Sequence, residues 1–540
     1  MHQPTRARLI VIVLVLATCL TAVAQQPQPG PGVAVRGRVV SAETGAPLSR
    51  VHVALSAATL RENIHALTNE SGEYELRDVS PGRYTVRATK TGFVSLTHGQ
   101  RRRSDVNRPV VVTADGVTDP VNFALPRGGV IVVQVLDEFG DPLARMTARV
   151  EQRRFIEGER RLVGSGDTQV ALVETDDRGE VRLPGLSPGE YYVAADMGPI
   201  GRITSDIQGR GYATTYYPGS MTPELARPVT VGPGQEVFVT IQMAVREPVA
   251  RVNGVALQAD GRQAQNVRVS LRPDSGLGGF TTDNPFSFRG LRSGGYTVEV
   301  GPNVTGAPSD QVGSAHFTVT GEDIADLVVT TRRGARIEGR IVFDSGVPTD
   351  LRANQFQLEA VRYVRDLTLP RFTVRGDWTF EGVGFNGSRT IRLRTAPEGW
   401  MLKSVILNGR DVTDTAVDFD ALTDVSGVEV AVTRTQATVA GQALDGRGVP
   451  VAQSVAILFP EDRREWTVMS RFFGTAVADE QGRFTVSALP PSRYLVAAVD
   501  RLHTGEERDP ELLERISRSA TPLTLREGES RTMTLRVIAN

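Results

Sequence analysis

The sequence predicts an all-β protein, a tandem array of about five antiparallel β-sandwich modules with one short helix in the last. The first observation behind this prediction is a strand–turn–strand pattern in residues 68–86. Tyr74 and Leu76 alternate with charged neighbours, as expected of a half-buried strand. Ser80-Pro81-Gly82 comes next and is predicted to be a turn, because proline presets one backbone angle and glycine tolerates positive φ. Tyr84 then opens a second alternating strand.

The second observation is that this pattern returns along the chain at intervals of roughly 100 residues, the size of one small domain. Each copy has a polar turn, an alternating strand, a second turn and a further strand. Clear copies lie at 176–193, 286–298 and 479–496, and a worn copy lies at 376–391. Since no long helical periodicity separates the copies, they predict one β-sandwich each.

The third observation is that the modules open and close with turns of their own. The opening turns, rich in glycine and proline, lie at 44–48, 139–143, 259–262 and 446–450. The closing strand–turn–strand units lie at 109–125, 229–241, 317–329 and 523–535. With about seven short strands in each module, antiparallel sandwiches in series are favoured.

One helix is predicted in an insertion of the last module. Asp509 is a good N-cap, and Pro510 suits the first helical position. Leu512, Leu513 and Ile516 share one face of this helix. We expect that face to pack against the last sandwich, and the alternative is a helix that binds a partner.

Composition places the chain among globular proteins and excludes a general attraction to nucleic acid. Of its 540 residues 23% are charged, and the formal net charge is −1. Lysine occurs only at Lys90 and Lys403, so nearly all positive charge is arginine. The basic run Arg101-Arg102-Arg103 is closely followed by Asp105. We predict a solvated loop there rather than a nucleic-acid or lipid site.

Residues 1–24 are predicted to be a secretory signal peptide, followed by a Gln/Pro/Gly linker at 25–33. Two arginines precede the apolar run 9–16, and the sequence Ala-Val-Ala at 22–24 supplies a cleavage site. The run is short for a membrane anchor, and an uncleaved anchor helix is the alternative. After cleavage no transmembrane span is expected.

The only cysteine, Cys19, lies inside this signal. The residues around it loosely resemble a bacterial lipoprotein box, so a lipoprotein anchored through Cys19 is the second hypothesis for localisation. On the first hypothesis the mature protein is exported to the periplasm, the outer surface or the medium. It then has no thiol, and hydrophobic cores hold its domains without disulfides.

The repeated turns resemble those of the carboxypeptidase regulatory-like domain. The resemblance rests on Gly-Arg-Val at 37–39, on Gly-Ala-Pro-Leu at 45–48 and on the pattern of residues 68–86. It implies a transthyretin-like, Ig-like β-sandwich with relatives among starch-binding-like folds. It also implies a multi-modular exported bacterial protein whose modules are accessory and carry no peptidase chemistry. The match is strong in the first, second and last modules, fair in the third and weak in the fourth.

We therefore predict five modules after the linker. Their ranges are 34–126 (module 1), 127–246 (module 2, with a Tyr-rich insertion), 247–333 (module 3), 334–434 (module 4, degenerate) and 435–540 (module 5, with a helical insertion).

Three kinds of motif suggest chemistry that their surroundings argue against. His503-Thr504-Gly505-Glu506 fits half of a zinc carboxypeptidase motif, but no histidine follows it. Gly185-Leu186-Ser187-Pro188-Gly189 matches a nucleophile elbow, but Pro188 lacks the N–H that an oxyanion hole needs. Acidic turns at 176–177 and 479–480 suit hairpins better than calcium. We predict no catalytic residue, metal site or cofactor.

The candidate ligand site is the Gly/Pro-rich loop 211–219. Its tyrosines Tyr212, Tyr216 and Tyr217 are suited to stacking on sugar rings or to anchoring a protein partner. The alternative is that these rings pack between modules 2 and 3. The same two interpretations stay open for Trp378, Trp400 and Trp466.

The favoured hypothesis is an exported, non-catalytic binding or structural protein that presents loops on tandem sandwiches. Its expected partner is a polysaccharide or an envelope protein, not nucleic acid, and carbohydrate binding is its most specific version. The alternative is an extracellular enzyme or enzyme accessory subunit with an unrecognised site in the C-terminal half. Asp411 and Asp414 would then serve as acid and base.

Overall fold

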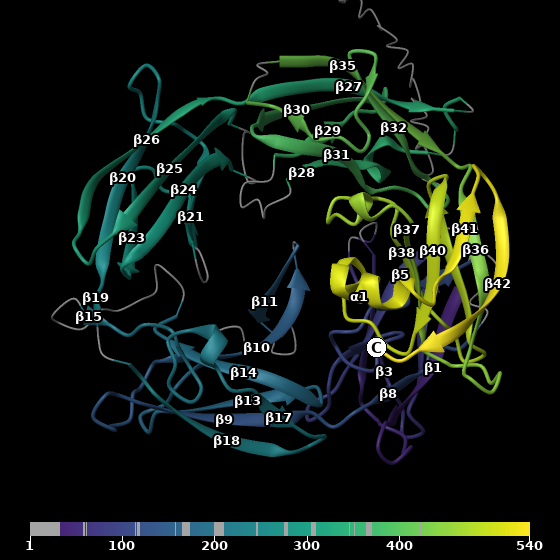
Figure 1. Ribbon diagram of the computed structural model, residues 1–540, viewed down its shortest axis with the longest axis horizontal. Coiled ribbons are helices and arrows are strands. Elements are labelled where there is room, and N and C mark those ends of the chain that lie inside the picture. The colour runs from purple at the N-terminus through teal and green to yellow at the C-terminus, as the bar shows by residue number, and fades with distance from the viewer. Residues whose placement is uncertain are drawn as a thin grey trace, which may run out of the picture.

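The computed structural model describes residues 33–540, except 58, 59, 61, 114, 116–118, 157, 165–172, 199–209, 245, 246, 275–278, 304–308, 345, 350, 363–369 and 421–423. The predicted signal peptide, Cys19 and the linker as far as residue 32 lie outside the described residues. The described chain is all-β with one short α-helix near its end, as predicted. Its strands follow one another in groups, for which we keep the names module 1 to module 5 (Figure 1).

Module 1 contains β1 (Val33–Ser41), β2 (His52–Ser56), β3 (Ile64–Leu67), β4 (Glu73–Val79), β5 (Gly82–Thr89), β6 (Leu96–Thr97), β7 (Val110–Val112) and β8 (Phe123–Leu125). Module 2 contains β9 (Gly129–Leu136), β10 (Thr147–Ile156), β11 (Glu159–Gly164), β12 (Val173–Glu174), β13 (Glu180–Leu186), β14 (Gly189–Asp196), β15 (Arg210–Gly211), β16 (Thr215–Tyr216), the 3-10 turn η1 (Pro223–Leu225), β17 (Val229–Val231) and β18 (Glu236–Gln242). Module 3 contains β19 (Glu247–Pro248), β20 (Ala250–Gln258), β21 (Val267–Pro273), β22 (Gly279–Thr281), β23 (Phe286–Leu291), β24 (Gly294–Pro302), β25 (Gln311–Val319) and β26 (Ile324–Arg333).

Module 4 contains β27 (Ala335–Phe343), η2 (Ala353–Gln355), β28 (Gln357–Val361), β29 (Phe372–Val374), β30 (Thr379–Phe385), β31 (Ser388–Thr395), β32 (Met401–Leu407), β33 (Arg410–Asp411), β34 (Val417–Asp418) and β35 (Asp424–Thr433). Module 5 contains β36 (Ala437–Leu444), β37 (Val455–Pro460), η3 (Arg463–Glu465), β38 (Gly474–Val477), β39 (Arg483–Leu489), β40 (Ser492–Val499), η4 (Glu506–Arg508), the helix α1 (Pro510–Ser517), β41 (Thr521–Leu525) and β42 (Ser530–Ile538).

One pairing rule repeats in every module. The first long strand pairs antiparallel with the strand after the polar turn and parallel with the last strand of its module. These sets are β1 with β4 and β8, β9 with β13 and β18, β20 with β23 and β26, β27 with β30 and β35, and β36 with β39 and β42. A second antiparallel pair faces each set: β2–β5, β10–β14, β21–β24, β28–β31 and β37–β40. Module 4 follows the same rule, so it keeps the strand pairing of the other modules although its turn motifs are degenerate.

Each module buries an apolar cluster of its own. In module 1 the predicted alternation is seen directly, because Tyr74, Leu76, Tyr84 and Val86 are all buried between the two layers. The clusters of the other modules likewise draw their residues from one module each. The burial of apolar surface, worth about 25 cal/mol per Å², therefore acts mainly within modules. The predicted boundaries between modules stay predictions.

The aspartates of the polar turns stabilise the starts of hairpins by accepting backbone hydrogen bonds. In module 2 the Asp176 side chain accepts two backbone N–H groups of its own turn, at 3.0 and 2.9 Å. The Asp479 side chain does the same in module 5, at 3.0 and 2.7 Å. The segment Gly185–Gly189 contains the end of β13, the turn at Ser187 and Pro188 and the start of β14, so it is a hairpin turn as the sequence indicated.

The helix α1 packs on module 5, as predicted. Asp509 accepts a hydrogen bond from the backbone N–H of Glu511 at 3.0 Å and so caps the helix. Leu512, Leu513 and Ile516 are buried in a cluster with residues of β37 and β40. The apolar face of α1 is thus covered by its own module.

The modules follow a closed path, so that module 5 returns to modules 1 and 2 (Figure 1). Asp105 of module 1 and His503 of module 5 form a β-bridge, and Arg160 on β11 of module 2 forms an ion pair with Asp509. The basic run at 101–103 is therefore not a simple solvated loop, because Arg101 donates to the carbonyl of Ala452 at 2.8 Å. None of the helices in the described part of the chain is long and apolar enough to span a membrane.

Candidate functional site

The three candidate tyrosines lie within module 2. Tyr212 is 5% exposed, belongs to the module 2 core and donates its hydroxyl to Glu138 Oε2 at 2.6 Å. Tyr216 is 9% exposed and pairs with Ala194 of β14. Tyr217 is half-buried against the same core. The structure thus brings the three together as packing residues, and a ligand-binding role for them stays a prediction.

The three tryptophans also pack against their own modules. Trp400 is 6% exposed, and Trp378 is partly buried. Both rings meet Phe343 edge-on, with centroids 5.2 and 4.7 Å away. Trp466 donates its indole N–H to the carbonyl of Pro460 at 2.8 Å. These contacts favour the packing interpretation for all three.

The two aspartates suggested as acid and base have separate partners. Asp411 accepts hydrogen bonds from the hydroxyl and the backbone N–H of Thr413, and these hold the pKa of Asp411 below its usual value. Asp414 accepts from Nε of Arg471 through both of its oxygens at 3.0 Å. Each carboxylate is therefore engaged, one in a turn and one in an ion pair with module 5.

The motifs rejected from sequence have structural partners as well. His503 of the half zinc motif faces Asp105 of module 1, with Nδ1 and Oδ1 3.4 Å apart. Ser187 of the elbow-like turn accepts the hydroxyl of Tyr191 on its backbone carbonyl at 2.6 Å. Within the described residues, no group of three or more His, Cys, Asp or Glu side chains is arranged to hold a metal ion.

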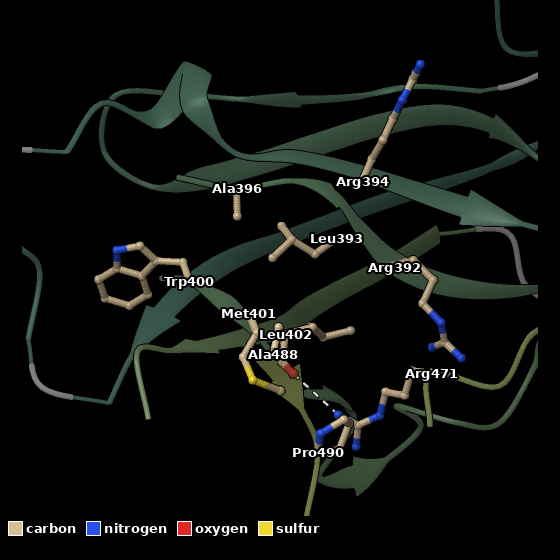
Figure 2. Close-up of a pocket in the computed structure, with 10 residues that line it drawn as sticks. All are labelled: Arg392, Leu393, Arg394, Ala396, Trp400, Met401, Leu402, Arg471, Ala488 and Pro490. Atoms are coloured by element: carbon tan, nitrogen blue, oxygen red, sulfur yellow. Dashed lines mark hydrogen bonds between the residues drawn. The ribbon is translucent and has the colours of Figure 1, made fainter. Parts of the chain in front are cut away.

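An open cleft of about 320 Å³ lies where module 4 meets module 5 (Figure 2). Strand β31 supplies Arg392 and Arg394, and Arg471 comes from the loop before β38. The other lining residues are mostly apolar: Leu393, Ala396, Trp400, Met401, Leu402, Ala488 and Pro490. In Figure 2 the side chain of Arg392 extends toward the segment that carries Arg471, the Arg471 guanidinium turns toward Leu402, and Arg394 points away from both.

The cleft joins the two modules by hydrogen bonds. Arg392 of module 4 donates to the carbonyl of Met469 in module 5 at 2.9 Å. In the opposite direction, Arg471 donates to the carbonyl of Leu402 at 3.3 Å, the contact drawn in Figure 2. Arg508, just before α1, holds the same module 5 loop through the carbonyls of Thr467 and Ser470, at 3.1 and 2.8 Å.

Three arginines line the cleft, and no carboxylate is among its lining residues. Asp414 is the carboxylate that the structure pairs with the arginines of the cleft, 3.0 Å from Arg471 and 3.5 Å from Arg392. Burial lowers the pKa of Arg392; Asp414 opposes this shift, and Arg471 and Arg508 add to it. Burial also lowers the pKa of Arg508. Arg471 and Arg508 therefore disfavour the charged form of Arg392, and an added anion would oppose that effect.

The sequence analysis missed this cleft. A period-2 reading would have placed Arg392 and Arg394 on one face of a strand, whereas their side chains point apart in Figure 2. Arg471 lies far along the chain in another module, and Asp414 was considered only for catalysis. Side chains from different modules meet only when the modules dock, so no local pattern marks such a site.

Comparison with protein families matches residues 34–126 to the carboxypeptidase regulatory-like domain. No curated protein matches the chain. Among solved structures, the TIE protein of Bacillus anthracis is 14% identical and covers 72% of this chain and 69% of its own, with a TM-score of 0.15. The minor pilin GBS52 of Streptococcus agalactiae is 17% identical and covers 39% of this chain and 95% of its own, with a TM-score of 0.20.

The major pilin subunit BcpA of Bacillus cereus is 11% identical and covers 76% of this chain and 99% of its own, with a TM-score of 0.14. At these TM-scores the likeness carries no argument about this chain. The family match covers the part of the chain in which the turn motifs are clearest, and its strands follow the expected order. Residues 34–126 of this chain therefore match the carboxypeptidase regulatory-like domain that the turn motifs resemble.

Proposed function

We propose that this chain is an exported, non-catalytic structural and binding protein, and that the cleft between modules 4 and 5 contacts an acidic segment of a protein at the cell envelope. One observation carries the proposal: Arg392 and Arg471 both line an open cleft of about 320 Å³ and share Asp414. Such a site attracts a carboxylate, because an arginine pair offers planar, charged donors.

The lining favours a peptide over a sugar. Apolar side chains such as Leu393, Met401 and Leu402 form much of the wall, and they suit the apolar neighbours of an acidic residue. Trp400 is buried, so it offers no open ring on which a sugar could stack. The lining contains no amide side chain, a common partner of sugar hydroxyls.

Two further observations support export and the absence of catalysis. The N-terminal sequence has the features of a secretory signal, and residues 34–126 match a regulatory-like domain rather than a peptidase. The enzyme alternative loses its suggested acid–base pair, because Asp411 and Asp414 are engaged with Thr413 and Arg471. Carbohydrate binding through Tyr212, Tyr216 and Tyr217 stays a separate hypothesis.

The test is binding of a labelled acidic peptide to the mature chain. Fluorescence anisotropy would follow a fluorescein-labelled octapeptide of alternating Glu and Leu, with a Gln-Leu peptide of the same length as its neutral match. We expect the acidic peptide to bind at least about tenfold more tightly and to lose affinity as salt is raised. Competition with polygalacturonate tests whether an acidic polysaccharide takes the site instead.

Two variants of the same ion pair separate binding from folding. Arg471→Gln removes a guanidinium and is expected to weaken binding of the Glu-Leu peptide. Asp414→Asn removes the competing carboxylate and is expected to strengthen binding of the same peptide. A mere disturbance of the junction would move both variants in the same direction. Arg289→Gln, an exposed arginine of module 3, is the control and should bind like the wild type. Equal binding of both peptides, or stronger competition by polygalacturonate than by the peptide, would overturn the proposal.

A further inference from the structure

The contact that closes the chain on itself is formed by two short segments, the loop 101–106 of module 1 and residues 502–504 of module 5. Their backbones pair: Val106 donates to the carbonyl of Leu502 at 3.2 Å, and Thr504 donates to the carbonyl of Ser104 at 2.9 Å. The side chain of Val106 also packs against the cluster that contains α1. The two modules are therefore joined as if by a short piece of β-sheet.

Charged side chains flank this β-like contact. On one side Arg101 donates to Gln453 Oε1 at 2.5 Å and to the carbonyl of Ala452 at 2.8 Å. On the other side Arg160, on the β10–β11 hairpin of module 2, donates to Asp509 Oδ2 at 2.6 Å. Figure 1 shows this hairpin reaching from module 2 toward α1.

At the centre of the contact lies a carboxylate and histidine pair. Asp105 Oδ1 and His503 Nδ1 are 3.4 Å apart, and the two side chains are 13% and 26% exposed. Both atoms are buried, and neither has a hydrogen-bond partner among the described residues. The other oxygen of Asp105 accepts the backbone N–H groups of Arg101 and Arg102, at 3.1 and 2.8 Å. The carboxylate therefore has one satisfied side and one side that faces the imidazole.

The charge on His503 decides what the free oxygen of Asp105 experiences. A protonated imidazole is a cation and a donor on both nitrogens, so it stabilises the buried carboxylate. A neutral ring leaves that carboxylate without a counter-charge at this side, which is unfavourable for a buried ion. Glu506, which accepts the backbone N–H of His503 at 2.9 Å, also favours the cation. Arg101, Arg102 and Arg103, which carry positive charge on the same loop as Asp105, oppose it.

We infer that residues 502–504 and 101–106 form a pH-dependent closure, which holds module 5 against module 1 while His503 is protonated and releases it when His503 is neutral. Histidine is the side chain that ordinarily changes charge between pH 5 and 8. The contact is non-covalent, and modules 1 and 5 are otherwise linked in sequence only through modules 2, 3 and 4. Acid therefore favours the closed path seen in Figure 1, and alkali favours an open chain.

The test measures the distance between modules 1 and 5 in the mature chain. The mature sequence has no cysteine, so Glu70→Cys and Ser519→Cys, at exposed positions of the two modules, place a pair of spin labels. Pulsed electron spin resonance would record the distance distribution at pH 5.5 and pH 9.0. We expect one short distance at pH 5.5 and about a tenfold higher ratio of open to closed chains at pH 9.0, since a charge-assisted hydrogen bond is of that strength.

Two variants assign the pH dependence to the pair. In His503→Gln and in Asp105→Asn the ratio of open to closed chains should no longer depend on pH. In His316→Gln, at an exposed position of module 3, the pH dependence should match that of the wild type. A distance that does not change with pH in the wild type, or a change that persists in His503→Gln, would overturn the inference.

Discussion

Gly441 on β36 lies directly opposite Phe484 on β39, and the phenyl ring occupies the space that a side chain at Gly441 would need. A Cβ at this position would come within 2.2 Å of the Met533 carbonyl oxygen and 2.7 Å of the Phe484 ring. The same cross-strand pair of glycine and aromatic residue recurs as Gly37 with Tyr74, Gly254 with Phe286 and Gly339 with Phe380. Module 2 has changed both members, to Val133 and Val181.

The first prediction follows from this pair. Gly441→Ala should destabilise module 5 by about 2–3 kcal/mol or more, because a backbone oxygen on β42 cannot move away cheaply. Hydrogen exchange of the intact chain, read by mass spectrometry, should show faster exchange in β36, β39 and β42. Gly446→Ala in the same module is the matched control, since a Cβ there meets nothing within 4 Å. Similar effects of both substitutions would contradict the argument.

The second prediction concerns a tyrosine that closes the turn between two strands. The hydroxyl of Tyr494 donates to the carbonyl of Pro490, four residues earlier, at 2.7 Å, and the ring is fully buried. Tyr84, Tyr191 and Tyr296 make the same bond in their modules. Tyr494→Phe keeps the ring but leaves the buried carbonyl without its donor, so we expect a loss of about 1–2 kcal/mol. Hydrogen exchange in β40 and β41 would measure it. An unchanged exchange rate there would show that water replaces the hydroxyl at no cost.

The third prediction concerns Arg389, which replaces the turn-closing tyrosine in module 4. Arg389 follows Gly387 as Tyr84 follows Gly82, and its guanidinium is completely buried. It donates to the carbonyls of Asn386 and Ala360, at 2.8 and 2.9 Å. We expect Arg389→Leu to cost about 3 kcal/mol, because both carbonyls lose a charged donor. Exchange in β28 and β31 would report the loss.

The control for Arg389 is another arginine of module 4. Arg410 lies on the exposed strand β33, so Arg410→Leu should leave exchange in β28 and β31 unchanged. If Arg389→Leu were equally harmless, the buried guanidinium would be dispensable to the fold.

The fourth prediction is a pH effect in module 1. Burial lowers the pKa of His98 below its usual value, and a hydrogen bond with the carbonyl of Arg108 partly opposes this. The unfolded chain therefore binds a proton more readily than the fold does, so module 1 should lose stability as the pH falls through about 6.5, the ordinary pKa of histidine. The loss should level off below the pKa of His98 in the fold.

Hydrogen exchange in β5 and β7, at pH values corrected for the intrinsic exchange rate, would measure this effect. His98→Gln keeps a donor for the Arg108 carbonyl without titrating, so its stability in module 1 should not follow pH in this way. The direction is opposite to that expected for His503, where protonation strengthens a contact. If module 1 became more stable at lower pH in the His503→Gln variant, the prediction would be refuted.

Much of the fold was readable from local sequence. Alternation at Tyr74 and Leu76 predicted a half-buried strand, and the aspartates of the polar turns predicted hairpins; both are seen because they depend on neighbours within a few residues. Asp509 and Pro510 predicted where α1 begins for the same reason. The repeated pattern also predicted that the strands form sandwiches in series.

The tertiary structure alone decided which surfaces meet. Arg392 lies beside Arg471, and Asp105 beside His503, although these pairs are separated by 79 and 398 residues. Their meeting depends on how whole modules dock. Because the apolar residues of each strand pattern are buried in the core of their own module, the pattern does not predict how the modules dock. The sequence by itself therefore determined the β-modules, their turns and the helix. The cleft between modules 4 and 5 and the closure onto module 1 arise from docking, where long-range ion pairs and a few backbone hydrogen bonds act between cores that are already complete.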